Sequence, residues 1–201
     1  IAALVVGRNG ALFHHAAGEA GERTMFRNAS MTKAVATTAA LQLVEQGRLR
    51  LDDPVASILP EFGRLQVLEG FDGDAPILRA PASQATVRQL MTHTSGCGYF
   101  FTNEKLLRWH ALTGAPTVLS GRKCSIATPL VNDPGTVWEY GVSTDWLGLV
   151  VEQVTGQTLG QALRERVYGP LRMDDSGFAP NEEQGARMLR VMQRQTDGGL
   201  A

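Results

Sequence analysis

The feature that most restricts the fold of this chain is the segment from residue 26 to residue 47, FRNASMTKAVATTAALQLVEQG. Small and apolar side chains recur one or two turns apart from residue 31 to residue 46, and Gly47 follows as a stop signal, so the spacing predicts a helix over residues 31–46. Alanines make up much of this run and can be buried on nearly every side of the helix. The sequence therefore predicts one helix at the centre of a core.

A serine and a lysine stand three residues apart at the start of this helix. Ser30 and Lys33 would share one face if the helix begins at or just before Ser30. They are then either a nucleophile with its proton acceptor or the polar first turn of a core helix. Burial among the following alanines would lower the pKa of Lys33. The positive end of the helix dipole would favour negative charge on Ser30.

The same spacing recurs at Ser120 and Lys123, which shows that the Ser-x-x-Lys pattern is weak by itself. In this second copy a glycine and an arginine intervene, Pro129 follows, and no apolar periodicity surrounds the pair. Lys123 is therefore expected to be a solvated loop charge. The surroundings of each pair, and not the spacing, distinguish the two copies.

The rest of the chain predicts more helices than strands. Residues 1–6 and 11–16 read as two strands of a hairpin, joined by GRNG. Residues 63–81 are rich in Gly, Pro and Asp and are expected to form a loop. Five further helices are expected: a short one before Pro60, and others around residues 87–91, over residues 103–112, over residues 143–155 and from about Leu159. The helix around residues 87–91 has Ser83 as its expected N-cap and Gly96 past its end. The helix over residues 143–155 has Ser143 as its expected N-cap and Gly156 at its end.

The length, hydrophobic content and charge of the chain exclude several classes of protein. With 201 residues and 43% hydrophobic content, the chain can bury one good core, as one large domain or as two interleaved lobes, and we expect a single domain over residues 1–201. The 19 basic and 20 acidic residues nearly cancel, so no basic field exists to bind nucleic acid. The longest apolar run, IAALVV, is far shorter than the roughly 18 residues that span a bilayer. Neither a nucleic-acid partner nor a membrane span is expected.

The cysteines and the first residues say little about compartment. Cys97 and Cys124 are not part of a Cys-x-x-Cys pair, and both are expected to be free, buried thiols. The chain opens on Ile1 without a methionine or a secretion signal, as expected of a processed protein or a piece of a longer one. The cytoplasm and the periplasm both stay open as locations.

Four blocks of sequence carry a family resemblance. They are the Ser30 segment FRNASMTKAVATTAALQLVEQGRLRLDDPVASILPEF, then VRQLMTHTSGCGY, DPGTVWEYGVSTDWLGLVVEQVTG and LRERVYGPLRMDDSGF. In this order they resemble the serine β-lactamase and penicillin-binding-protein superfamily, and especially the class C β-lactamase-like family VIII carboxylesterases. The resemblance implies an α+β fold with a helical lobe packed on an antiparallel sheet. We expect this sheet to be incomplete here, because the family's C-terminal strands have no counterpart in the chain.

The resemblance also implies roles for individual residues. Ser30 matches the acylated nucleophile, Lys33 the lysine one turn later, and Tyr140 the tyrosine whose phenolate acts with that lysine as general base. Trp138 stands close enough to Tyr140 to line the substrate pocket. Val142 replaces the asparagine with which the β-lactamases bind the substrate amide, and this favours an ester over a lactam. No metal or organic cofactor is implied.

The function expected from these residues is hydrolysis of short-chain carboxylic esters, with a small-molecule ester as the partner. A D-alanyl peptidase or a weak β-lactamase is the nearest alternative. The family's third motif, a Lys-Thr-Gly, His-x-Gly or Trp-x-Gly element that completes the oxyanion hole, is not found in the sequence. A truncated, non-catalytic relative is therefore a further alternative, and its unfinished sheet edge would favour a homo-oligomer. His93 is expected to be a structural residue at a helix end.

Overall fold

The structure, a computed structural model, describes residues 1–199 of the chain. The residues divide into two compact units, Ile1–Met31 with Met173–Ala201 as the first and Thr32–Arg172 as the second. The expected single domain over residues 1–201 stays a prediction. No helix within residues 1–199 is long and apolar enough to cross a membrane.

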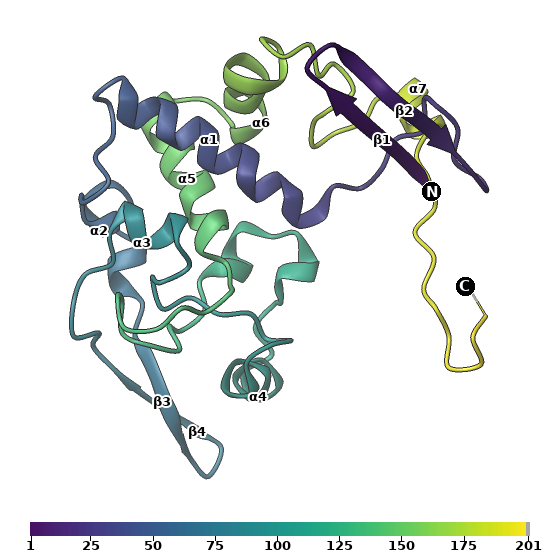
Figure 1. The fold of residues 1–201 in the computed structure, drawn as a ribbon. Coiled ribbons are helices and arrows are strands. Elements are labelled where there is room, and N and C mark those ends of the chain that lie inside the picture. Colours follow the sequence, from purple (N-terminus) through teal and green to yellow (C-terminus); the bar gives the residue numbers. More distant parts are fainter. Residues whose placement is uncertain (200–201) are drawn as a thin grey trace. The chain divides into compact units, whose positions relative to one another are not determined.

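Helices and two small antiparallel sheets make up the fold, as expected for a mixed α+β protein (Figure 1). The strands are β1 Ala2–Gly7, β2 Gly10–Ala16, β3 Val67–Asp72 and β4 Ala75–Arg79. The α-helices are α1 Thr32–Glu45, α2 Val55–Ile58, α3 Val87–Met91, α4 Glu104–Thr113, α5 Ser143–Thr155, α6 Leu159–Leu163 and α7 Glu182–Ala186. A π-helical turn, Arg164–Tyr168, continues α6.

The central helix predicted from the alanine-rich run is α1, and it lies beside α5 in the second unit (Figure 1). Ala39, Ala40 and Leu43 are fully buried on α1. On α5 the core includes Trp146, whose indole N–H donates to the Ile126 carbonyl at 3.1 Å. Ala40 and Leu43 of α1 and Trp146 of α5 belong to one buried core; the sequence predicted the burial of α1 but not its partner helix.

Two of the predicted N-caps are wrong, for different physical reasons. Thr86, not Ser83, caps α3 in a reciprocal capping box with Gln89. At α5 the helix begins at Ser143, but its hydroxyl does not cap it. Instead this hydroxyl lies 2.9 Å from that of Ser95, and both side chains are fully buried. The Ser143 hydroxyl, which the sequence pattern assigned to a helix end, is therefore part of the buried core.

The expected loop over residues 63–81 is wrong, because this segment folds into the hairpin β3–β4. Its glycines and aspartates form the tight turn, where Gly73 has a φ of 54°. Pro76 is tolerated because each strand of a two-stranded sheet is an edge strand. Arg79 pairs across the hairpin with Glu69 at 2.6 Å, and it also pairs with Asp133, outside the hairpin, at 2.7 Å.

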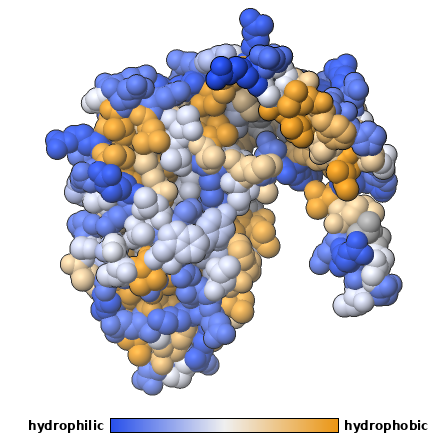
Figure 2. Space-filling view, in the orientation of Figure 1, coloured by the Kyte–Doolittle hydropathy of each residue, from blue (hydrophilic) through white to orange (hydrophobic). Residues whose placement is uncertain are grey.

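In the first unit, β1 and β2 form the hairpin predicted from GRNG. Large apolar side chains on this hairpin are exposed, and they contribute to the orange surface in Figure 2. Leu4 and Val6 on β1 are 60% and 63% exposed, and Leu12 on β2 is 74% exposed. The described part of the chain therefore leaves this two-stranded sheet uncovered.

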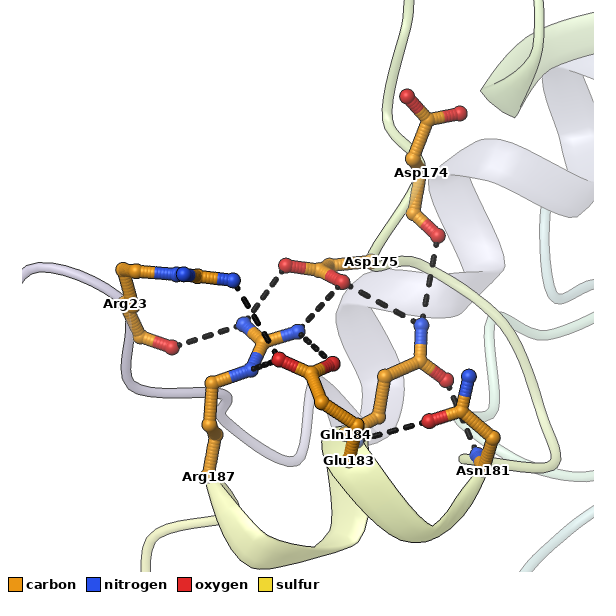
Figure 3. A network of polar contacts seen from close by, with 7 residues as sticks. All are labelled: Arg23, Asp174, Asp175, Asn181, Glu183, Gln184 and Arg187. Atoms are coloured by element: carbon orange, nitrogen blue, oxygen red, sulfur yellow. Dashed lines mark hydrogen bonds and ion pairs between the residues drawn. The ribbon is translucent and has the colours of Figure 1, made fainter.

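A polar network joins the two segments of the first unit (Figure 3). Arg187 donates to both carboxylate oxygens of Asp175 at 2.8 Å and to Glu183 at 2.9 Å. It also donates to the Arg23 carbonyl at 3.0 Å, next to a parallel bridge between Met25 and Met188. The network fixes residues 23–25, which lead to the turn that contains Ser30.

A close backbone approach at Gly141 joins two segments of the second unit. A Cβ at this position would overlap the carbonyl oxygen of Cys97 and the Cα of Gly98. Only a residue without a side chain lets the segment after Tyr140 lie directly against residues 97–98.

Replacing this glycine therefore tests the packing of the site. Gly141→Ala is expected to lower the free energy of unfolding in urea by about 1–3 kcal/mol, the usual cost of overpacking. Gly70→Ala is the matched control, because a Cβ there meets open space and Gly70 needs no positive φ. Its effect should stay below about 0.5 kcal/mol. Equal unfolding midpoints for the two variants would contradict the proposed close approach.

Candidate active site

The amine of Lys33 lies over two tyrosine rings at the N-terminal end of α1. Its Nζ is 5.0 Å from the ring centroid of Tyr140 and 5.5 Å from that of Tyr99. The two phenol rings meet edge to face, with their centroids 5.4 Å apart. A cation over two aromatic faces is electrostatically favourable. The structure therefore brings Lys33 and Tyr140 together, as the motif resemblance implies.

The protonation state of Lys33 differs from the one expected. Burial by itself lowers the pKa of Lys33, but hydrogen bonds with the hydroxyls of Tyr99 and Tyr140 outweigh it and leave the pKa above its ordinary value of 10.5. The expected fall was wrong because the pattern of alanines shows burial but not the two phenols. Lys33 is thus an ammonium at neutral pH.

Tyr99 is the residue of this cluster that the sequence analysis did not single out. It ends the block VRQLMTHTSGCGY, and only 8% of the residue is exposed. Burial raises the pKa of Tyr99, the Asp145 carboxylate adds to the rise, and Lys33 opposes both. Tyr99 therefore stays a neutral phenol at pH 7. The signal that could have revealed it was a tyrosine in a block already assigned to the family.

Asp145, on the first turn of α5, is an acidic group that interacts with both Lys33 and Tyr99. Its side chain retains solvent contact, yet the protein atoms around the carboxylate raise its pKa by desolvation. The positive charge of Lys33 opposes this rise, as does a hydrogen bond with Tyr99. A carboxylate whose pKa is shifted by desolvation and by a specific charge partner is a candidate functional residue.

His93 adds a third ring next to Tyr140. The ring centroids of His93 and Tyr140 are 4.9 Å apart. Burial lowers the pKa of His93, and the charge of Lys33 lowers it further, so this imidazole is neutral at pH 7. His93 has a φ of 55°, an uncommon conformation for a residue with a side chain. Its Nδ1 is buried and has no hydrogen-bond partner within residues 1–199.

Ser30 lies in a 3-10 turn, Ala29–Met31, and not in the α-helix. The helix α1 begins at Thr32, one residue after the predicted start, so the α-helix itself does not begin at or just before Ser30, as a shared helix face with Lys33 would require. Ala29 has a φ of 42°, which a residue with a Cβ rarely adopts. This strained turn belongs to the first unit, whereas Lys33 and Tyr140 belong to the second.

The two predicted substrate-binding residues have opposite environments. Trp138 is 64% exposed, and its ring lies nearly parallel to that of Tyr140, with the centroids 6.4 Å apart. Val142 is 1% exposed and packs in the main core. Its side chain fills the core, and the position offers no hydrogen-bonding group.

The thiols and the second Ser-x-x-Lys pair lie apart from this cluster. Cys97 is buried as expected, and burial raises the pKa of its thiol to about 12. Cys124 is exposed, so the expectation for it was wrong. It lines a hollow of about 650 Å³ together with Lys123 and Glu152, and this hollow shares no residue with the Lys33 cluster. Lys123 is exposed but pairs with Glu152 at 2.6 Å.

Comparison with known proteins identifies the family. The sequence profile of the β-lactamase family matches residues 1–201, so this chain belongs to the β-lactamase family. It is 40% identical over 174 residues to the lovastatin esterase of Penicillium rubens, a match that covers 85% of this chain and 44% of the relative. Esterase EstB of Burkholderia gladioli is 37% identical over 199 residues, a match that covers 90% of this chain and 47% of that esterase.

A solved structure agrees with this assignment. EstCE1, described as a hydrolase with promiscuous acyltransferase activity, superposes with a TM-score of 0.78 at 25% identity, and the match covers 100% of this chain and 53% of EstCE1. The resemblance to the β-lactamase and penicillin-binding-protein superfamily is confirmed, and so is the fold class. This chain spans about half the length of the relatives it matches. Those relatives are named esterases, and another relative is named an acyltransferase.

The raised pKa of Lys33 can be tested on the 201-residue chain. Tyr99→Phe removes one hydroxyl and is expected to lower the pKa of Lys33, because hydrogen bonding to Tyr99 contributes to the rise. The sequence contains three lysines, so the pKa can be followed by NMR of the ¹³Cε resonances.

Tyr168→Phe is the matched control, since Tyr168 is a 5% exposed tyrosine in a separate core cluster. It should leave the Lys33 titration unchanged. An identical Lys33 pKa in the wild type and in Tyr99→Phe would show that the phenol does not stabilise the ammonium.

Proposed function

We propose that this chain is a serine hydrolase that cleaves short-chain carboxylic esters through an acyl-enzyme on Ser30. The observation that carries the proposal is the ammonium of Lys33 over the rings of Tyr99 and Tyr140. An isolated phenol, with a pKa near ~10, is a poor base at neutral pH. A fixed neighbouring cation favours its phenolate and so makes a tyrosine usable as a general base.

Of the two phenols, Tyr140 is the proposed base. Tyr99 is held protonated by burial and by Asp145. Tyr140 takes the proton of Ser30 while the serine oxygen attacks the ester carbonyl carbon. It then gives this proton to the leaving alcohol as the carbon–oxygen bond breaks. Water repeats the two steps on the acyl-enzyme and releases the carboxylic acid.

An ester is favoured over a lactam for two reasons. Val142 gives the site no amide group for binding a substrate amide, and its side chain is buried. The relatives with esterase names support the same choice. A D-alanyl peptidase or a weak β-lactamase remains the alternative within this fold.

The relatives also support a second acceptor for the acyl group. Acyltransferase mokF of Monascus pilosus is 41% identical over 157 residues. An alcohol in place of water would convert the same acyl-enzyme into a new ester. We therefore include transfer to an alcohol in the proposed function.

Removal of the nucleophile tests the proposal. The 201-residue chain is expected to hydrolyse p-nitrophenyl butyrate, and Ser30→Ala should lower kcat by roughly 10³-fold or more, as removal of a catalytic serine does. Ser120→Ala is the matched control, because Ser120 has the same spacing to a lysine but lies in a separate 3-10 turn, Val118–Ser120. It should keep the wild-type rate.

Two other outcomes would exclude the ester assignment. Faster turnover of nitrocefin than of the ester would favour the β-lactamase alternative. Equal, negligible turnover of the ester by the wild type and Ser30→Ala would favour a non-catalytic relative.

The exposed hairpin β1–β2 supports a homo-oligomer as an additional proposal. Its apolar side chains, and its strand edges, which pair with no third strand among residues 1–199, are features through which sheets pair with other chains. We expect concentration-dependent association in sedimentation velocity, and Leu12→Lys should weaken it. Leu119→Lys, which changes an 82% exposed leucine of the second unit, should not. A wild type that is monomeric at all concentrations would contradict this proposal.

A further inference from the structure

Two serines and a cysteine form a small polar cluster inside the apolar core of the second unit. The hydroxyls of Ser95 and Ser143 lie 2.9 Å apart, and both residues are 0% exposed. Cys97 is buried with them, and hydrogen bonds with both serines oppose the rise that burial causes in the pKa of its thiol. Burial of a hydroxyl is costly unless it has a hydrogen-bond partner. The two serines therefore depend on each other.

This serine pair joins the two segments that carry the phenols of the candidate site. Ser95 lies four residues before Tyr99, and Ser143 lies three residues after Tyr140. Ser143 is also the first residue of α5, the helix that packs beside α1 and its Lys33. The Ser95–Ser143 hydrogen bond thus connects the segment of one phenol to the segment of the other.

The backbone of Tyr140 is fixed both before and after this residue. Before it, Glu139 donates its backbone N–H to the His93 carbonyl at 2.9 Å. After it, the Ser143 hydroxyl meets that of Ser95. A ring carried between two such hydrogen bonds has little freedom to shift. The second bond is made by side chains alone, so substitution can remove it without changing a backbone group.

We propose that Ser95 and Ser143 are positioning residues, and that their buried hydrogen bond keeps the Tyr140 ring beside the Lys33 amine. The inference rests on the proposed function and adds to it the groups that hold the general base in place. Both serines are fully buried, so they act through the backbone that carries Tyr140 and not on a substrate. Such positioning matters because a shift of about 1 Å in a catalytic group can lower a rate by roughly 10²-fold.

The position of Tyr140 also affects the protonation of Lys33. The Lys33 Nζ is 5.0 Å from the centroid of the Tyr140 ring, and hydrogen bonding to Tyr140 is one of the interactions that raise the pKa of Lys33. A Tyr140 ring that moves away should therefore lower this pKa. The pKa of Lys33 thus reports the position of Tyr140 without any need for catalysis.

Removal of one hydroxyl or of both separates positioning from stability. Ser95→Ala or Ser143→Ala leaves the other hydroxyl buried without its partner, so each should lower the melting temperature. The double variant removes both hydroxyls, and its melting temperature should recover most of this loss. Its Lys33 pKa, followed by NMR of the ¹³Cε resonances, should nevertheless stay below that of the wild type. Its kcat for p-nitrophenyl butyrate should be roughly tenfold to 10²-fold lower, with KM little changed.

Ser125→Ala is the matched control for the loss of a buried hydroxyl. Ser125 is 3% exposed and donates to the Arg122 carbonyl at 2.6 Å, in the separate 3-10 turn Lys123–Ile126. Its substitution should lower the melting temperature but leave the Lys33 pKa and kcat unchanged. A wild-type Lys33 pKa in the double variant would overturn the proposal, and so would a wild-type kcat. Equal losses of kcat in the double variant and in Ser125→Ala would overturn it as well.

A conservative variant extends the test to the case in which the double variant does not fold. Ser143→Cys keeps a weaker donor, and in reducing buffer its Lys33 pKa should lie between those of the wild type and Ser143→Ala. Equal Lys33 pKa values in these three proteins would overturn the proposal. If the wild type shows no ester turnover but the Lys33 pKa falls in the double variant and not in Ser125→Ala, the proposed function fails and the positioning role stands. Ester turnover with an unchanged Lys33 pKa would leave the proposed function intact and exclude the positioning role.

Discussion

The contact of one ammonium with two phenol rings is the interaction on which the candidate site depends. Lys33 can hold this position because α1 is a core helix, fixed by fully buried alanines against α5. The two phenols arrive from separate segments. Gly141 lets the segment of Tyr140 lie against the backbone just before Tyr99. Core packing therefore determines the distance between the Lys33 amine and the Tyr140 ring, and the proposed chemistry relies on this distance.

The protonation states of the groups around Lys33 are consistent with one another. Hydrogen bonds with the phenols keep Lys33 charged in spite of its burial. The same cation helps to keep His93 neutral, and Asp145 helps to keep Tyr99 protonated. One positive charge beside two neutral rings is suited to stabilise a negative charge that develops nearby during reaction. This arrangement supports the assignment of Tyr140 as the base, and it needs a charged lysine and not the neutral one that burial alone would produce.

The sequence predicted the parts of the fold that depend on local pattern. The hairpin at the N-terminus, the central helix and the start of α6 follow from turn residues and apolar spacing. The hairpin β3–β4 was missed because glycine and aspartate mark a tight turn and a loop alike. The helix α7 was missed because none of its residues is buried, so no apolar spacing marks it.

In the candidate site, too, the sequence did not reveal contacts between residues that are far apart along the chain. Lys33 and Tyr140 were found through family motifs, but the shift in the Lys33 pKa could not be predicted, because it depends on a second tyrosine 66 positions away in sequence. Tyr99 stands at the end of a block that resembles the family, but its position in that block does not show that it contacts Lys33. Ser143 was assigned to a helix end, although its hydroxyl is buried against that of Ser95. Such contacts depend on tertiary structure, which residue spacing does not reveal.

The central claim is that Ser30 is made nucleophilic by the Lys33 cluster. The most direct measurement is covalent labelling of the intact chain with a fluorophosphonate, followed by peptide mass spectrometry, in the wild type and in Lys33→Met. The account predicts a single label on Ser30 in the wild type and little or none in Lys33→Met of equal melting temperature. Labelling of Ser30 at the same rate in both proteins, or a label on another residue, would contradict it.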